Sequence, residues 1–169
     1  MKVGLIVLTW NAAETAVECL KTVVEQQRAP DYMLVVDNAS SDGTADRIAQ
    51  EFPDIRLIRN PRNLGFSGGM NVGIRTLQDM PKPPDIVALL NQDTLLDHSW
   101  LGAIVAPFEG KPHLGAVGSK IRYPDGTIQH AGAYLKRPRR GAAHGWHEPD
   151  TGQYDDSRPY DLVTGAASP

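Results

Sequence analysis

The sequence predicts an α/β fold in which a central, mostly parallel sheet is flanked by helices. Short runs of branched apolar residues alternate with longer segments whose apolar residues recur at helical spacing. This alternation is typical of parallel strands joined by right-handed crossovers. Residues 3–8 and 86–90 are apolar at nearly every position, as expected of strands buried on both faces. A chain of 169 residues, of which 41% are hydrophobic, is long enough for one domain with its own core.

Each expected element has a local signal in the sequence. Strands are predicted from apolar, branched runs at residues 3–8, 32–36, 55–58, 86–90, 114–121 and 128–135. Helices are predicted from spaced apolar residues over 13–24 and 45–52, from a glycine-rich entry leading into 70–77, and again from Trp100. Residues 136–159 are rich in Pro, Gly, His and Asp and predict a long mobile loop. A further element starts at Tyr160, so we expect the domain to be truncated at its C-terminus.

Composition excludes several classes of protein. The formal net charge of −3 gives no global attraction to nucleic acid or to a membrane. The single cysteine, Cys19, rules out an internal disulfide framework and a four-cysteine zinc site. Residues 3–8 are too short for a membrane span or a signal peptide. We therefore expect a cytoplasmic protein.

Three polar loops follow three of the predicted strands: Thr9-Trp10-Asn11, Asp37-Asn38-Ala39-Ser40 and Asn91-Gln92-Asp93. The carboxyl ends of parallel strands share one edge of a sheet, which is where ligands bind in open α/β sheets. An acidic side chain in such a loop can accept hydrogen bonds from a base or a ribose. Asp93, with an amide oxygen two residues earlier, suits a hard divalent cation that holds phosphates. Turn formation is the alternative explanation for each loop by itself.

Several of these segments together resemble the family 2 glycosyltransferases, which have the GT-A fold. Four segments carry the resemblance. The first two are Val7-Leu8-Thr9-Trp10-Asn11 and Val35-Val36-Asp37-Asn38-Ala39-Ser40-Ser41-Asp42-Gly43-Thr44. The third runs from Asn60 to Gly73 and contains Leu64-Gly65-Phe66-Ser67-Gly68-Gly69-Met70-Asn71, and the fourth is Leu90-Asn91-Gln92-Asp93-Thr94. It covers residues 3–122, with a weaker echo at Val163-Thr164-Gly165-Ala166. The subgroup is rhamnosyltransferase-like and builds cell-surface polysaccharide.

The resemblance implies a role for each matching residue. The residues implied to bind the nucleotide sugar are Thr9, Asn11, Asp37, Asn38, Asp42, Gly68 and Asn71. Within this set Asp37 is implied to face the base. Gly68, together with Gly65 and Gly69 in the same segment, lets the backbone approach the ligand closely. Asn91 and Asp93 occupy the ends of the metal motif and imply Mg²⁺ or Mn²⁺. An Asn at its first position, in place of Asp, can still coordinate through its amide oxygen.

The implied reaction moves a sugar from a nucleoside-diphosphate sugar, a UDP- or dTDP-sugar such as dTDP-rhamnose, to a hydroxyl of a glycan or lipid-linked acceptor, with inversion. Residues 1–122 would form the donor-binding half and residues 123–169 the start of the acceptor half. The family places its general base after the segment resembling Val163-Thr164-Gly165-Ala166, so we expect it beyond Pro169 and expect donor binding with little turnover. The alternative is a nucleotide-sugar-binding domain without catalysis.

Three further patterns in the sequence suggest other functions. Gly65-Phe66-Ser67-Gly68-Gly69 matches a hydrolase G-x-S-x-G motif but lacks the strand that must precede its serine. His144-Gly145-Trp146-His147-Glu148 lacks zinc-protease spacing and predicts surface histidines. The basic run Lys136-Arg137-Pro138-Arg139-Arg140 is either a solvated loop or a contact with acceptor phosphate or anionic lipid, which would place the protein at the inner face of the membrane. No dinucleotide-binding or P-loop motif occurs.

Overall fold

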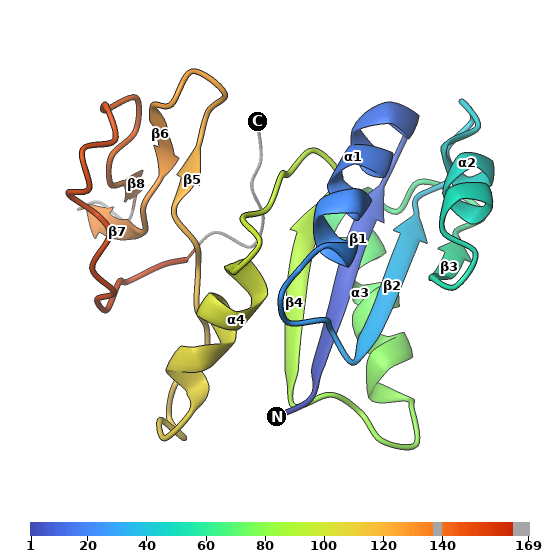
Figure 1. The fold of residues 1–169 in the computed structure, drawn as a ribbon, viewed down its shortest axis with the longest axis horizontal. Helices are drawn as coiled ribbons and strands as arrows, with labels where there is room; N and C mark the ends of the chain where they lie inside the picture. Colours follow the sequence, from blue (N-terminus) through green and yellow to red (C-terminus); the bar gives the residue numbers. More distant parts are fainter. Residues whose placement is uncertain (137–139, 164–169) are drawn as a thin grey trace. The chain divides into compact units, whose positions relative to one another are not determined.

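The computed structural model (Figure 1) describes residues 1–136 and 140–163. Two compact units make up the chain: the first is Met1–Ala103, and the second begins at Ile104. The predicted α/β fold is confirmed in the first unit, which holds the candidate site.

A four-stranded parallel sheet forms the centre of the first unit, in the order β3-β2-β1-β4. The strands are β1 (Val3–Thr9), β2 (Tyr32–Asp37), β3 (Arg56–Arg59) and β4 (Ile86–Asn91). Thr9 pairs with Asp37, and Leu8 pairs with Asn91. The register therefore brings the carboxyl ends of β1, β2 and β4 to one level at one edge of the sheet.

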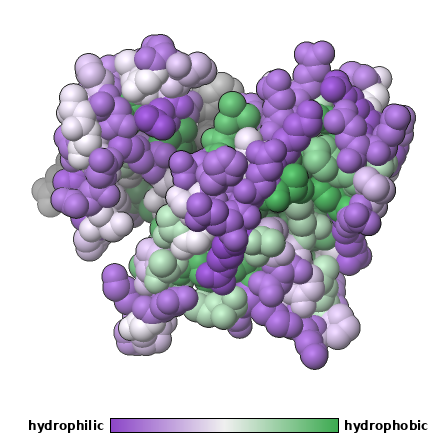
Figure 2. Space-filling view, viewed as in Figure 1, coloured by the Kyte–Doolittle hydropathy of each residue, from purple (hydrophilic) through white to green (hydrophobic). Residues whose placement is uncertain are grey.

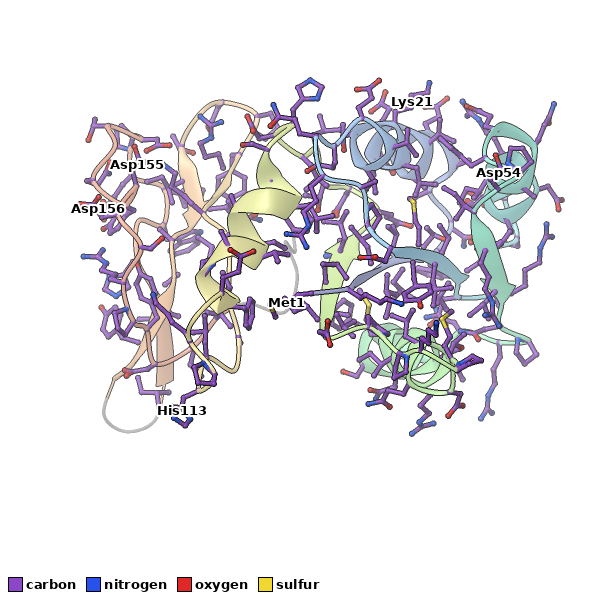
Figure 3. The ribbon with its side chains drawn as sticks, turned by 60° about the horizontal axis from the view of Figure 1, so that its bottom comes forward. Met1, Lys21, Asp54, His113, Asp155 and Asp156 are labelled. Atoms are coloured by element: carbon purple, nitrogen blue, oxygen red, sulfur yellow. The ribbon has the colours of Figure 1, made fainter. Side chains whose placement is uncertain are left out.

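Helices cover both faces of this sheet. They are α1 (Ala13–Val24), α2 (Thr44–Glu51) and α3 (Gly65–Gln78), and Figure 3 shows α1 and α3 on opposite sides of the strands. The face toward α3 is a core built from residues of β1, β2 and α3: Ile6, Leu34, Val36, Met70 and Leu77. The other face is covered by the buried side chains of α1, which are Ala16, Val17, Cys19, Leu20 and Val23.

Two glycines set how closely α3 approaches β1. A Cβ atom built on Gly73 would lie 2.8 Å from Cγ2 of Ile6, and one built on Gly69 would collide with Cδ1 of Leu8. Because the two glycines are four residues apart, they lie on the same side of the helix. This part of the glycine-rich segment therefore serves helix packing.

The expected strands and helices of the first unit are confirmed within one to three residues at most ends. The glycine-rich segment is not a separate loop before the helix, because α3 already begins at Gly65. Ser67 consequently lies within α3 and not at a strand-to-helix turn, which agrees with the rejection of a hydrolase site.

The second unit differs from the prediction in three places. After α4 (Trp100–Val105) and the short 3-10 helix η1 (Ala106–Phe108), residues 114–120 are not a strand, and only β5 (Ile121–Arg122) is. The expected strand 128–135 is divided into β6 (Ile128–His130) and β7 (Ala133–Lys136), since Gly132 between them has a φ of 88°. The expected loop 136–159 contains β8 (Arg140–Ala143), paired with β7.

The first of these differences has a physical cause in the glycines of the segment. The wrongly predicted strand contains Gly115 and Gly118, and a Cβ built on Gly118 would lie 2.9 Å from Cβ of Val163. Small residues permit such close contacts but give a strand little side-chain surface to pack.

No helix in the described part of the chain is long and apolar enough to cross a bilayer.

Candidate functional site

A hollow of about 240 Å³ opens at the carboxyl edge of the parallel sheet. Its walls come from the ends of β1 and β4, from the residue after β2, and from the start of α3. The lining residues are Leu8, Thr9, Trp10, Asn38, Asn63, Gly65, Phe66, Asn91, Gln92 and Asp93. The three polar loops predicted to converge therefore do lie together.

Asp37, at the end of β2, is almost fully buried, with 2% of its surface exposed. Its Oδ1 lies 3.4 Å from the donating hydroxyl of Thr9, and its Oδ2 accepts a 3.0 Å bond from the backbone N–H of Ser40. Thr9 lines the hollow, whereas Asp37 is not among the lining residues. The predicted contact of Asp37 with a base stays a prediction.

Asn11 connects the loops that follow β1 and β2. Its backbone N–H donates to Oγ of Ser40 at 2.9 Å, and its side-chain Oδ1 accepts from the N–H of Ser41 at 2.8 Å. The residue has a φ of 45°, which asparagine tolerates better than most residues. Asn11 therefore fixes the shape of this edge and lies outside the lining of the hollow.

Asn38 uses its complete hydrogen-bonding capacity inside the protein. Its Oδ1 accepts from Nδ2 of Asn60 and from the N–H of Leu64, while its Nδ2 donates to Oδ1 of Asn63 and to the carbonyl of Gly65. An asparagine amide has two donors and two acceptor lone pairs. Asn38 therefore holds the turn before α3 against the end of β2.

Asp42 stabilises the start of α2. Its Oδ1 accepts bonds from the side chain of Thr44 at 2.5 Å and from the N–H of Thr44 at 3.0 Å. These bonds lower the pKa of Asp42. The hydroxyl of Thr44 in turn accepts from the N–H of Ala12 at 3.0 Å. Asp42 thus links the starts of two helices, away from the hollow.

The polar triplet after β4 is joined to the loop after β1 through its middle residue. Oε1 of Gln92 accepts from the N–H of Trp10 at 2.7 Å, and its Nε2 donates to the carbonyl of Trp10 at 3.2 Å. The side chain of Gln92 thus continues the pairing of β1 with β4 beyond Asn91. On either side of it, Asn91 is half-buried and Asp93 is exposed.

The two remaining predicted residues lie on α3. A Cβ built on Gly68 would be 2.8 Å from Cβ of Leu64, so the first turn of this helix is tightly packed. Asn71 is exposed and does not line the hollow. Because it follows Gly69 by two residues, it points about 200° around the helix from the side that meets β1.

A family model agrees with this geometry. The model described as Glycosyl transferase family 2 matches residues 5–162, nearly the whole chain.

The chain belongs to glycosyl transferase family 2.

The relatives of this family 2 chain are longer than the chain itself. It is 31% identical over 121 residues to the N-acetylglucosaminyl-diphospho-decaprenol L-rhamnosyltransferase of Mycobacterium tuberculosis, an alignment that covers 68% of the chain and 39% of the relative. It is 28% identical to the mannosyltransferase PcManGT of Pyrobaculum calidifontis, solved with GDP-Man and Mn²⁺, with a TM-score of 0.62 over 73% of the chain and 36% of that protein.

A third comparison supports the fold. The S. aureus protein TarS (residues 1–349), solved in complex with UDP-GlcNAc, has a TM-score of 0.54 and 22% identity over 64% of the chain and 31% of the solved protein. The predicted family and its GT-A-like fold are therefore confirmed. The chain spans about two fifths of the length of the rhamnosyltransferase it matches.

The family 2 site offers a divalent cation few protein ligands. The described residues contain no group of three or more His, Cys, Asp or Glu side chains that could hold a metal. Asp93 and Asn91 provide one carboxylate and one amide, both of which are hard oxygen donors. This set fits Mg²⁺ or Mn²⁺ bound partly by substrate phosphates, because such ions are held by one or two carboxylates and not by an all-protein cage.

Three residues of the hollow had no role in the sequence-based prediction. Trp10 and Phe66 line it while keeping 50% and 44% of their surface exposed, and Gln92 joins two of its loops. An aromatic residue inside a polar loop or a glycine-rich segment is the signal that could have identified the first two. The role of Gln92 depends on a partner 82 positions away, which the local sequence does not reveal.

Proposed function

We propose that this chain provides the donor-binding part of a glycosyltransferase, with the nucleotide portion of a nucleoside-diphosphate sugar in the hollow. One observation carries the proposal: the loops after β1, β2 and β4 are hydrogen-bonded to one another around a single hollow with Asp93 at its rim. Family membership and relatives that are named as transferases support it.

The hollow combines flat apolar surfaces with fixed polar groups. Trp10 and Phe66 offer exposed rings to a base or a sugar. Behind them, the hydroxyl of the buried Thr9 donates to the buried carboxylate of Asp37 and fixes the polar wall of the hollow. Ligand sites commonly have such a largely apolar lining with a few placed polar groups. Asn38, which lines the hollow, and Asn11, which does not, both hold the loops in position through their hydrogen bonds.

Asp93, assisted by Asn91, would hold Mg²⁺ or Mn²⁺ against the diphosphate. When bound, the cation would neutralise the charge that develops on the departing nucleoside diphosphate. Gln92 fixes the position of the segment that carries both ligands. Because Asp93 is exposed, its carboxylate is available to a ligand in solution.

In the proposed reaction the acceptor oxygen forms a bond to the anomeric carbon as the bond from that carbon to the diphosphate breaks, with inversion. The hydroxyl proton passes to a general base. We place this base outside residues 1–169, because the resemblance locates it after the segment like Val163-Thr164-Gly165-Ala166 and the chain spans only 39% of the rhamnosyltransferase.

We further propose a UDP- or dTDP-sugar donor, such as dTDP-rhamnose, and a glycan or lipid-linked acceptor in polysaccharide synthesis. The support is the likeness to a relative named as a rhamnosyltransferase that acts on a diphospho-decaprenol. A cytoplasmic site at the inner face of the membrane would suit such an acceptor. The basic run proposed to contact lipid falls mostly outside the described residues, since 137–139 are not described.

Isothermal titration with UDP, dTDP and GDP, in Mn²⁺ and in EDTA, tests the donor site. We expect one nucleotide to bind more tightly in Mn²⁺ and Asp93→Ala to abolish that gain. Asp85→Asn is the matched control: Asp85 precedes β4 at the opposite edge of the sheet, where its Oδ2 accepts from the N–H of Lys2 at 2.7 Å.

The outcomes separate the alternatives. Equal loss in both variants, or no binding of any nucleotide by a folded protein, would refute the donor site. Binding that needs Asp93, with no sugar transfer by the longer protein that contains this chain, would favour a binding domain without catalysis.

A further inference from the structure

The turn from Gly145 to Glu148, in the second unit, presents an aromatic side chain to solvent. The N–H of Glu148 donates to the carbonyl of Gly145 at 2.8 Å, which places Trp146 and His147 at the two central positions of a β-turn. Trp146 is 64% exposed. Large aromatic side chains are usually packed inside a protein or used to bind something.

The rings of Trp146, His147 and Tyr123 hold one another in place. The His147 ring stacks on that of Tyr123 with centroids 5.1 Å apart and planes 12° apart, and it lies 4.8 Å from the Trp146 ring. The indole N–H of Trp146 lies 3.4 Å from the Tyr123 hydroxyl. We call these three side chains the aromatic platform.

The backbone beneath the aromatic platform is fixed to β6. His147 donates to the carbonyl of Ile128 at 2.8 Å, and Ile128 donates to the carbonyl of Glu148 at 2.9 Å. A Cβ built on Gly145 would lie 2.8 Å from Cγ2 of Ile128, so the turn is pressed against the strand. The rings are thus ordered before any ligand arrives, which lowers the entropy lost on binding.

His147 occupies a strained position in this turn. Its φ is 60°, at the turn position that normally takes Gly or Asn. A left-handed conformation is unfavourable for a residue that carries a side chain, and strain of this kind clusters at functional sites. Keeping a histidine there preserves the ring that lies between Tyr123 and Trp146.

The surroundings of the aromatic platform are acidic and polar. Asp125 and Glu148 are exposed neighbours in sequence of Tyr123 and His147. Oδ1 of Asp125 accepts from the N–H and the hydroxyl of Thr127 at 2.8 and 2.7 Å, and these bonds lower the pKa of Asp125, so this carboxylate stays charged in the turn that follows Tyr123. The visible face of the second unit, on the left in Figure 2, is largely hydrophilic.

We propose that the aromatic platform binds a sugar ring, as part of the acceptor glycan. A pyranose presents a face of C–H groups that fits the negative face of an aromatic ring, and its rim of hydroxyls can donate to carboxylates such as Asp125 and Glu148. Nearby carboxylates would repel an anionic membrane. The assignment to the acceptor rests on the proposed function, whereas sugar binding itself does not.

The test uses the complete chain without nucleotide. Saturation-transfer NMR and tryptophan fluorescence would measure binding of N-acetylglucosamine, N,N′-diacetylchitobiose, cellobiose and methyl α-mannoside. We expect saturable binding of at least one of these sugars and a loss of about tenfold in affinity with Trp146→Ala, the size of effect that one aromatic contact gives. Leu135→Ala is the matched control, since Leu135 is an apolar side chain of the same unit that is 54% exposed.

His147→Gly separates binding from folding. Glycine adopts a positive φ without strain, which offsets the lost ring contacts with Tyr123 and Trp146. This variant should therefore melt close to the temperature of the parent and yet bind the sugar more weakly. Nucleotide titrations run in parallel should be unchanged in both variants. Failure of the nucleotide to bind would count against the donor site and leave the aromatic platform supported.

Three results would overturn the proposal. One is that no sugar of the set binds saturably. Another is that Trp146→Ala and Leu135→Ala weaken binding equally. The third is Trp146-dependent binding to vesicles of phosphatidylcholine and phosphatidylglycerol without sugar binding, which would assign the rings to a membrane contact.

Discussion

The two units of this chain are stabilised in different ways. In the first unit, strands buried on both faces pack between α1 and α3. Among the described residues of the second unit, the buried apolar side chains are Val105, Ile128, Ala131 and Ala133. There the ordering comes from turns, ion pairs and ring contacts, such as those of His144 with Tyr134, Tyr154 and Tyr160.

The comparison shows why the site is built where it is. A hollow lined by loop residues keeps its geometry only when the strands beneath are fixed, and the parallel sheet provides that foundation. The second unit depends on individual polar and aromatic contacts, so single substitutions there should have smaller and more local effects.

The largest difference between the two units should appear when one buried side chain of each core is truncated to alanine. Leu34→Ala, in the core between β2 and α3, should lower the free energy of unfolding by about 2–5 kcal/mol. Ile128→Ala should cost less, because fewer buried apolar neighbours surround it in its unit. Hydrogen exchange of the two segments would measure both effects. A larger loss of protection for Ile128→Ala in its own unit would contradict the comparison.

Asn38→Ala should have the next largest effect. It leaves Nδ2 of Asn60 and the N–H of Leu64 without their acceptor, which costs about 1–3 kcal/mol for a buried polar group. We expect lower stability and weaker nucleotide binding together, because the turn before α3 loosens. Chemical denaturation and titration measure the two effects. Asn71→Ala, on the exposed side of α3, is the control and should change stability little.

His147→Gly and Ala39→Gly test the strained residues of each unit. Both native residues have positive φ, at 60° and 64°. Ala39→Gly should raise stability by about 0.5–1 kcal/mol, since relief of strain exceeds the added chain entropy. His147→Gly should change stability less, because the relief of strain is offset by the loss of the ring contacts with Tyr123 and Trp146. Thermal melting would show it. Trp146→Gly, one position earlier in the turn, should instead destabilise, because the φ of Trp146 is not positive.

The ion pairs of Lys120 should contribute least. Nζ of Lys120 lies 2.8 Å from Oδ2 of Asp150, and this contact lowers the pKa of Asp150 and raises that of Lys120. The stabilisation from Asp150 is present above its ordinary pKa of 3.8 and is lost as the pH falls through the lower folded value. The melting temperature should fall in that acid range, and less so for Asp150→Asn. If the melting temperature of Asp150→Asn falls with acid as much as that of the parent, Asp150 is not the cause.

The first unit could be predicted because its determinants are local. Apolar runs such as 3–8 and 86–90 specify buried strands, and parallel topology then brings the loops that follow them to one edge. The particular task of each polar residue could not be predicted in the same way. Asn38 and Asp42 occupy motif positions, but their hydrogen bonds depend on Asn60, Leu64 and Thr44 after folding.

The second unit was predicted less well, for a related reason. Its strands are two to four residues long, and their pairing depends on turns around glycines with positive φ, such as Gly126 and Gly132. The histidine cluster was expected at the surface. His147 is exposed, but His144 is half-buried and contacts three tyrosine rings.

The reactivity of the Cys19 thiol can report on the carboxyl edge of the parallel sheet. It is buried on α1, and its Sγ donates to the carbonyl of Asn91 at 3.4 Å. Burial raises the pKa of this thiol to about 12, and the nearby charge of Asp93 adds to the effect. In the folded state it should therefore resist maleimide and iodoacetamide. The rate at which it becomes alkylated would then record how often α1 separates from the end of β4, without any introduced label.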